Sequence, residues 1–221
     1  MAAVEVRYSL IVFDWDGTLI DSAGTIVECI QAASREMGLP VPERELASHV
    51  IGLGLHDSLR HAVPDLPRER YRDFAGLYRR HFLARESSMS LFAGVPQLLA
   101  GLGRRGHLLA VATGKSRAGL DRALEASGLG VHFCASRCAD ETDPKPHPAM
   151  LLELMQELGA EPQQVLMVGD TSHDLEMARN AGVDAVAVTY GAHPLHTLRA
   201  LNPRVCVASV ADLERWLTQN G

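Results

Sequence analysis

The segment Leu10–Ser22, LIVFDWDGTLIDS, gives the clearest structural signal in the chain. It begins with four apolar residues and continues with two aspartates separated by one tryptophan. A short, continuous apolar run is typical of a parallel strand covered on both faces, and ligands bind at the carboxyl ends of such strands. Because side chains alternate along an extended segment, Asp14 and Asp16 point to the same side. Neighbouring carboxylates repel each other unless a cation or a shared proton compensates, so the pattern indicates a functional site.

The two aspartates suit different chemical roles. Asp14 is a candidate nucleophile, because an aspartate that forms an acyl phosphate splits one difficult displacement into two easier ones. Asp16 is a candidate proton donor and acceptor. The alternative is a plain strand followed by a turn, since Asp-Gly is a common turn pair.

The segment DWDGTLIDS resembles the first motif of the haloacid dehalogenase (HAD) superfamily, in its phosphatase form. The resemblance implies that Asp14 is the nucleophile and Asp16 the general acid and base. Three further motifs of that superfamily follow in order, so the resemblance covers nearly the whole chain. It is closest to the phosphoglycolate phosphatase branch.

A second apolar run, LLAVATGKS, ends in Thr113 and Gly114 before a predicted helix. A hydroxyl and free backbone N–H groups at a helix start can bind an anion. The run is similar to the second HAD motif, whose hydroxyl binds the transferring phosphoryl group. A P-loop is excluded because Leu109 stands where that motif needs glycine. We expect Lys115 at the surface.

Lys145 lies between Pro144 and Pro146, which stiffen the loop around it. This loop resembles the third HAD motif, and the resemblance implies that the lysine pairs with the nucleophile and the phosphate. A rigid exposed loop with no chemical role is the alternative.

A third apolar run, Val165–Gly169, leads directly into Asp170, and Asp174 follows one turn into a helix. Acids at a helix start also complement the helix dipole, which is the structural alternative. GDxxxD resembles the fourth HAD motif. The resemblance implies Mg²⁺ held by the Asp14 side chain, the Asp16 backbone carbonyl and Asp170, with Asp174 behind them or orienting the lysine. We expect His173 at the surface.

The residues between the first two motifs predict a separate helical domain. Helical patterns cover 22–37, 43–50, 56–62 and 68–85, with no convincing strand. We therefore expect a small all-helical cap at 19–89 on an α/β core at 1–18 and 90–221. Within the cap, Gly52, Gly54 and His56 belong either to a substrate-facing loop or to a plain turn.

The core is predicted to be a doubly wound parallel sheet, Rossmann-like as in the HAD superfamily. Beyond the first strand, we expect strands at 107–113, 131–135, 165–169, 184–188 and 204–207, with helices between them. The segment GLGRRG, 101–106, matches a dinucleotide-binding pattern but precedes a strand instead of following one, so we interpret its glycines as a helix stop.

Composition limits the partners. A net charge of -6 argues against nucleic acid or an anionic membrane. We see neither a signal peptide nor a membrane-spanning run, and four scattered cysteines suit a reducing compartment. We expect a cytoplasmic enzyme, monomeric or homodimeric, that acts on a small-molecule phosphate ester.

The predicted activity is Mg²⁺-dependent hydrolysis of a small phosphate monoester, such as a phosphoglycolate-like acid or a sugar phosphate. Asp16 argues against the dehalogenase and phosphonate-cleaving branches of the family, and the cap has no lysine for a Schiff base. A phosphosugar mutase is disfavoured because Leu55 stands where those members place an arginine. A catalytically silent binding protein of the same fold stays open.

Overall fold

The computed structural model describes residues 7–221; residues 1–6 of the predicted core lie outside the described part. Its centre is a six-stranded sheet in the order β3-β2-β1-β4-β5-β6, with every neighbouring pair parallel. The strands are β1 (Leu10–Phe13), β2 (Leu108–Thr113), β3 (Ala135–Cys138), β4 (Val165–Gly169), β5 (Asp184–Val188) and β6 (Val205–Val207).

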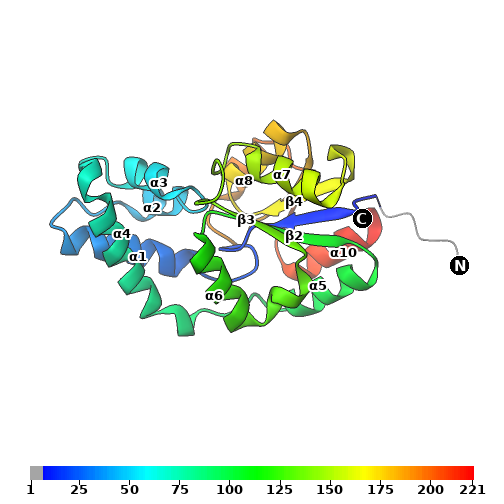
Figure 1. Cartoon of the computed structure of the whole chain (residues 1–221), viewed down its shortest axis with the longest axis horizontal. Coiled ribbons are helices and arrows are strands. Elements are labelled where there is room, and N and C mark those ends of the chain that lie inside the picture. Colours follow the sequence, from blue (N-terminus) through cyan, green and yellow to red (C-terminus); the bar gives the residue numbers. More distant parts are fainter. Residues whose placement is uncertain (1–6) are drawn as a thin grey trace, which may run out of the picture.

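Helices cover both faces of the sheet (Figure 1). One face packs against α5 (Val95–Arg104), α6 (Arg117–Ser127) and α10 (Val210–Asn220), and the other against α7 (Ala149–Leu158), α8 (Ser172–Ala181) and α9 (Leu195–Arg199). Side chains of the first strand contribute to both hydrophobic clusters. Ile11 and Phe13 belong to one, and Leu10 and Val12 belong to the other. This arrangement confirms the doubly wound α/β fold.

The chain between β1 and α5 forms helices at the end of the molecule away from the C-terminus (Figure 1). They are α1 (Ala23–Glu36), α2 (Arg44–His49), α3 (Leu55–Ala62) and α4 (Tyr71–Leu83), with short 3₁₀ turns at Arg68–Arg70 and Glu86–Ser88. Their apolar faces form a third hydrophobic cluster, distinct from the two on the sheet. We propose that 19–89 folds as a cap on this cluster, and "cap" below means these residues.

Some boundaries differ from the predictions. The third strand begins at Ala135, not at 131, because Leu129–His132 forms a 3₁₀ turn after Gly128, whose φ of 68° is left-handed. Gly101 and Gly103 lie inside α5; only Gly106, with a φ of 92°, follows the end of that helix. Of the three glycines interpreted as a helix stop, only Gly106 therefore has that position.

Candidate active site

Three neighbouring strands bring the predicted polar residues to one edge of the sheet. β1 lies between β2 and β4, and Phe13 is in register with Val111 and Val168. Asp14 continues the pairing, because its backbone N–H donates to the Val168 carbonyl at 2.9 Å. Asp14, Thr113 and Asp170 therefore follow adjacent strand ends, and all three side chains are buried.

Lys145 joins this edge from the loop between β3 and α7. Its ammonium is fully buried, and Nζ lies 2.7 Å from Asp14 Oδ1 and 2.6 Å from Asp174 Oδ1. A buried ammonium is stable only where anions compensate its lost hydration. The lysine thus fixes one oxygen of Asp14 and leaves Asp14 Oδ2 buried without a hydrogen-bond partner.

Asp170 is held from two directions. Thr18 Oγ1 donates to its Oδ1 at 2.8 Å, and the Ala192 backbone N–H donates to its Oδ2 at 2.7 Å. Two glycines make room for the carboxylate, since a Cβ at Gly17 or at Gly191 would come within 2.2 Å of Asp170 Oδ2. The first aspartate motif and the loop after β5 therefore shape the place where Asp170 lies.

Asp174 makes contacts both within the start of its helix and with the buried lysine. It stands in the first turn of α8 and forms a capping box with Thr171, whose backbone N–H and hydroxyl donate to Asp174 Oδ2. Its other oxygen faces Lys145. Both oxygens are thus engaged by protein groups, which suits a residue that orients the lysine.

Asp16 is bound by two side chains that the sequence did not assign to it. Ser22 starts α1, but its hydroxyl donates to Asp16 Oδ1 at 2.7 Å instead of capping the helix. Lys115 Nζ lies 3.0 Å from Asp16 Oδ2, and its side chain is only 12% exposed. The prediction of a surface position for Lys115 was wrong, because the loop after β2 turns this side chain back across the neighbouring end of β1.

The predicted anion site also lies at this edge. Thr113 and Gly114 line the same cavity as Asp14 and Asp16, and the Lys115 backbone N–H donates to Thr113 Oγ1 at 3.2 Å. A Cβ at Gly114 would come within 2.6 Å of the Gly52 carbonyl oxygen. The cap loop therefore touches the core at the glycine that follows Thr113.

Only part of the predicted cap loop faces the cavity. Gly52 lines it, with a φ of 90° that favours glycine. Gly54 packs against Pro144 instead, and His56 lies in a separate hollow beside Tyr71. The structure does not bring Gly54 or His56 to the cavity, because the first turn of α3 carries His56 to another side.

Burial and neighbouring charges shift the pKa values of Asp14, Asp170 and Lys145. Burial raises the pKa of Asp14, and the charge of Asp174 acts in the same direction, against Lys145. Burial also raises the pKa of Asp170, again with help from neighbouring carboxylates. Burial alone would lower the pKa of Lys145, but Asp14 and Asp174 outweigh it and raise that pKa. The buried carboxylates of this site therefore carry more negative charge, when ionised, than Lys145 alone can balance.

These residues fit a divalent cation. Oxygen atoms of Asp14, Asp170 and Asp174 lie within 4.8 Å of one another. When all three are ionised, Lys145 balances one charge, and the remaining two equal the charge of such an ion. Carboxylate oxygens are preferred ligands of Mg²⁺, and the buried Asp14 Oδ2, which has no hydrogen-bond partner, indicates that the site can take further positive charge.

Three histidines join the cap to this side of the core. The backbone carbonyl of His49, at the end of α2, accepts hydrogen bonds from His173 Nε2 at 2.7 Å and His193 Nε2 at 3.1 Å. Nearby, Ser48 Oγ donates to the Ala192 carbonyl at 2.8 Å. His173 is buried, so its predicted surface position was wrong. No local sequence signal marks this contact, since it joins residues far apart in the chain.

Known proteins are similar to this chain in sequence and in fold. The family model described as haloacid dehalogenase-like hydrolase matches residues 11–188. The chain belongs to this family. The probable phosphatase IndB of Dickeya dadantii is 37% identical over 211 residues, 92% of this chain and 91% of the relative.

Two further proteins extend the comparison. The tyrosine-protein kinase PtkA of Mycobacterium tuberculosis is 37% identical over 82% of this chain, which corresponds to 62% of that protein. A crystal structure of a predicted phosphoglycolate phosphatase from Haemophilus somnus has a TM-score of 0.85 at 27% identity, covering 95% of this chain and 98% of that one. The family model, the IndB phosphatase and the structure from Haemophilus somnus together show that the chain is a phosphatase of the HAD-like hydrolases. It is therefore a phosphoric monoester hydrolase.

None of the helices described between residues 7 and 221 has the length and apolar character needed to cross a bilayer.

Proposed function

We propose that this phosphatase hydrolyses a small phosphate monoester with the help of Mg²⁺, through an aspartyl-phosphate intermediate on Asp14. One observation carries the proposal. Asp14 lines the cavity with one oxygen tied to Lys145, while its other oxygen is buried and has no partner. A carboxylate held in one orientation with a free oxygen is suited to attack a bound phosphoryl group.

In the first step Asp14 attacks phosphorus, the bond from phosphorus to the ester oxygen breaks, and Asp16 gives a proton to the departing alcohol. In the second step Asp16 takes a proton from water, which attacks phosphorus, releases inorganic phosphate and restores the Asp14 carboxylate. The assignment of both transfers to Asp16 is supported by its position, because it lines the same cavity and two side chains fix its carboxylate.

The remaining residues bind and orient the phosphoryl group. Thr113 and the backbone N–H groups that follow it would bind its oxygens, and Lys145 would supply positive charge beside Asp14. The Asp14 side chain, the Asp16 backbone carbonyl and Asp170 would hold Mg²⁺, which supplies neutralisation of phosphoryl charge when bound. Asp174 would hold Lys145 in place.

The names of the relatives do not decide the substrate. The protein of similar structure from Haemophilus somnus is called a predicted phosphoglycolate phosphatase. This chain corresponds to only 62% of the length of the kinase PtkA. Phosphoglycolate is a substrate to test in its own right, and we do not extend the kinase activity to this chain.

The test is hydrolysis of p-nitrophenyl phosphate with Mg²⁺, compared with the same assay in EDTA. We expect turnover with Mg²⁺ and none with EDTA. An Asp14→Asn variant should be inactive while keeping the fold, and Asp143→Asn, at an exposed loop carboxylate, serves as the matched control with normal activity. Absence of metal-dependent turnover in the unaltered protein would favour a silent binding protein of this fold.

A further inference from the structure

The cavity that holds Asp14 and Asp16 extends far into the cap. Its volume is about 320 Å³, which lies in the range of cavities that hold drug-sized ligands. A phosphoryl group beside Thr113 would fill only the part next to the core. The rest is space for the leaving group, and its lining therefore indicates which alcohols the enzyme accepts.

The walls of that space are aliphatic and aromatic. The helix α4 contributes Phe74, Tyr78 and Phe82, which are spaced four residues apart and therefore share one face. Tyr78 and Phe82 stack on each other with ring centroids 5.9 Å apart. The helix α1, which packs on α4, contributes Ile26 and Ile30.

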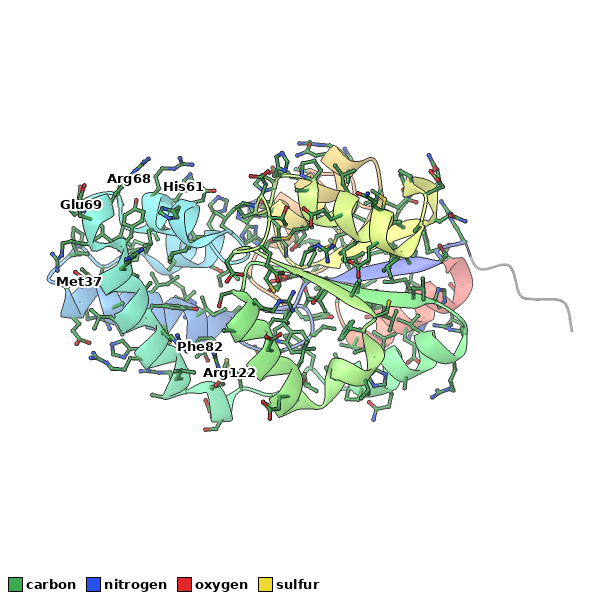
Figure 2. The ribbon with its side chains drawn as sticks, in the orientation of Figure 1. Met37, His61, Arg68, Glu69, Phe82 and Arg122 are labelled. Atoms are coloured by element: carbon green, nitrogen blue, oxygen red, sulfur yellow. The ribbon has the colours of Figure 1, made fainter. Side chains whose placement is uncertain are left out.

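Few charges face this space, and most of those that do are engaged. Lys115 is paired with Asp16 and lies 4.7 Å above the ring of Phe82. Arg122 donates to the Ala118 carbonyl and lies 3.9 Å from Glu86, and Arg79 is exposed to solvent. Figure 2 labels Phe82 and Arg122, which approach the cavity from α4 and α6.

A second anionic group on the substrate would fit poorly in the part of the cavity that lies in the cap, called the chamber below. A carboxylate loses its hydration when it enters apolar surroundings, and that loss must be offset by a free cation or several hydrogen bonds. The aliphatic and aromatic walls offer neither. Arg79, a cation of the lining with no ion pair among the described residues, is exposed to solvent, where a charge pair contributes little. Arg122 Nε is buried without a hydrogen-bond partner, 3.9 Å from Glu86, and it could serve one acceptor atom of the leaving group.

Tyr78 supplies a second polar contact next to the chemistry. Burial raises the pKa of its phenol, and the charge of Asp16 acts in the same direction. The hydroxyl thus keeps its proton. Tyr78 therefore contributes an aromatic ring and a protonated hydroxyl to the cavity that also holds Asp16.

Resting on the proposed function, we propose that the substrate is a phosphate monoester of an apolar, ring-bearing alcohol, and that the chamber disfavours esters with a second anion such as phosphoglycolate. The ring of the leaving group stacks against Tyr78, which is partly exposed, whereas Phe74 and Phe82 on the same face of α4 are buried.

The experiment compares three alkyl esters: 2-phenylethyl phosphate, ethyl phosphate and 2-phosphoglycolate. Alkyl leaving groups avoid the intrinsic reactivity of phenyl esters. With Mg²⁺, kcat/KM for 2-phenylethyl phosphate should exceed that for the other two by about tenfold or more. An equal or higher kcat/KM for 2-phosphoglycolate, or no advantage over ethyl phosphate, would overturn the inference and leave the phosphatase function intact.

A pair of variants locates the effect on the chamber wall. Tyr78→Leu should lower the ratio of kcat/KM between 2-phenylethyl and ethyl phosphate by roughly two- to tenfold, through loss of ring stacking. Tyr71→Leu is the matched control, because Tyr71 begins the same helix but lies at the separate hollow of His56. An unchanged ratio in Tyr78→Leu, or the same fall in both variants, would contradict the assignment of the wall.

Measuring ester binding to an inactive variant tests the substrate preference independently of the proposed mechanism. The Asp14→Asn protein, titrated calorimetrically with each ester in the presence of Mg²⁺, should bind 2-phenylethyl phosphate most tightly. Such binding supports the inference even where no ester is hydrolysed and the proposed mechanism fails. Tightest binding of 2-phosphoglycolate would overturn it.

Discussion

Lys145 Nζ lies 2.7 Å from Asp14 Oδ1, at the meeting point of the first and third sequence motifs. The two residues are 131 positions apart in the chain, and both are buried. The contact leaves Asp14 Oδ2 without a hydrogen-bond partner.

Replacing the lysine should damage both activity and stability. Lys145→Met would leave Asp14 and Asp174 buried without their cation, and removing one member of a buried ion pair typically costs about 3–5 kcal/mol. Urea denaturation measures this loss, and turnover should fall below detection. The control is Arg72→Met, an exposed position on α4, which should change neither quantity appreciably. A Lys145→Met protein as stable as the unaltered one would show that the pair carries no net stabilisation.

Metal binding should be visible without catalysis. Because Mg²⁺ would balance carboxylates that burial leaves short of positive charge, it should stabilise the folded state by about 2.7 kcal/mol at a concentration one hundred times its dissociation constant. Thermal denaturation with and without Mg²⁺ measures the effect. Asp170→Asn should shift the titration to higher Mg²⁺ concentration, and an unchanged titration would remove Asp170 from the ligand set.

Gly191 should be intolerant of a single methyl group. A Cβ there would come within 2.2 Å of Asp170 Oδ2, so Gly191→Ala must displace the carboxylate or the loop. We expect destabilisation of about 1–3 kcal/mol together with weaker Mg²⁺ activation. Gly76→Ala, inside α4 with no neighbour within 4 Å, should instead stabilise the protein by about 0.5–1 kcal/mol. Normal Mg²⁺ activation in Gly191→Ala would show that Asp170 tolerates the shift.

Acid should weaken the contact of His193 with the start of α8. Burial lowers its pKa from 6.5 to about 4, and His173 and His49 act in the same direction. Its Nδ1 accepts the Ser172 backbone N–H at 3.0 Å, which a protonated ring could not do.

Since the folded state binds this proton less readily than the unfolded chain, the stabilisation is complete above pH 6.5 and is lost as the pH falls from there through about 4. Between pH 7.5 and 5 the protein should lose about 2 kcal/mol more than the His193→Asn variant. Denaturation at both pH values measures this, with His196→Asn, at an exposed position, as a control that follows the unaltered protein. Parallel losses in His193→Asn would contradict the role of His193.

The sheet could be predicted because its information is local. Continuous apolar runs such as Leu10–Phe13 mark buried parallel strands, and adjacency of their ends follows from the parallel topology. Asp14, Thr113 and Asp170 could thus be placed at one edge before any coordinates were known. Lys145 needed the family resemblance, because a lysine between prolines is equally typical of an exposed loop.

The contacts across the cap could not be predicted in the same way. His49, His173 and His193 meet only when the cap lies on the core, and no periodicity records that docking. Lys115 was misplaced because spacing does not tell which way a loop side chain turns. The aromatic spacing of Phe74, Tyr78 and Phe82 was visible in the sequence, but such a stripe usually packs into a core, and only the cavity distinguishes the two cases.

The central claim is that Asp14 carries the phosphoryl group during turnover. The most direct measurement is acid quenching of an Asp16→Asn variant mixed with p-nitrophenyl phosphate and Mg²⁺, followed by mass spectrometry of the peptides. The leaving group of this ester needs little protonation, whereas the second step lacks its base, so phosphate should accumulate on the peptide that contains Asp14 and be released by hydroxylamine. Turnover of this ester by the unaltered protein, with no phosphorylated Asp14 peptide detectable in the variant while it still releases p-nitrophenol, would contradict the account.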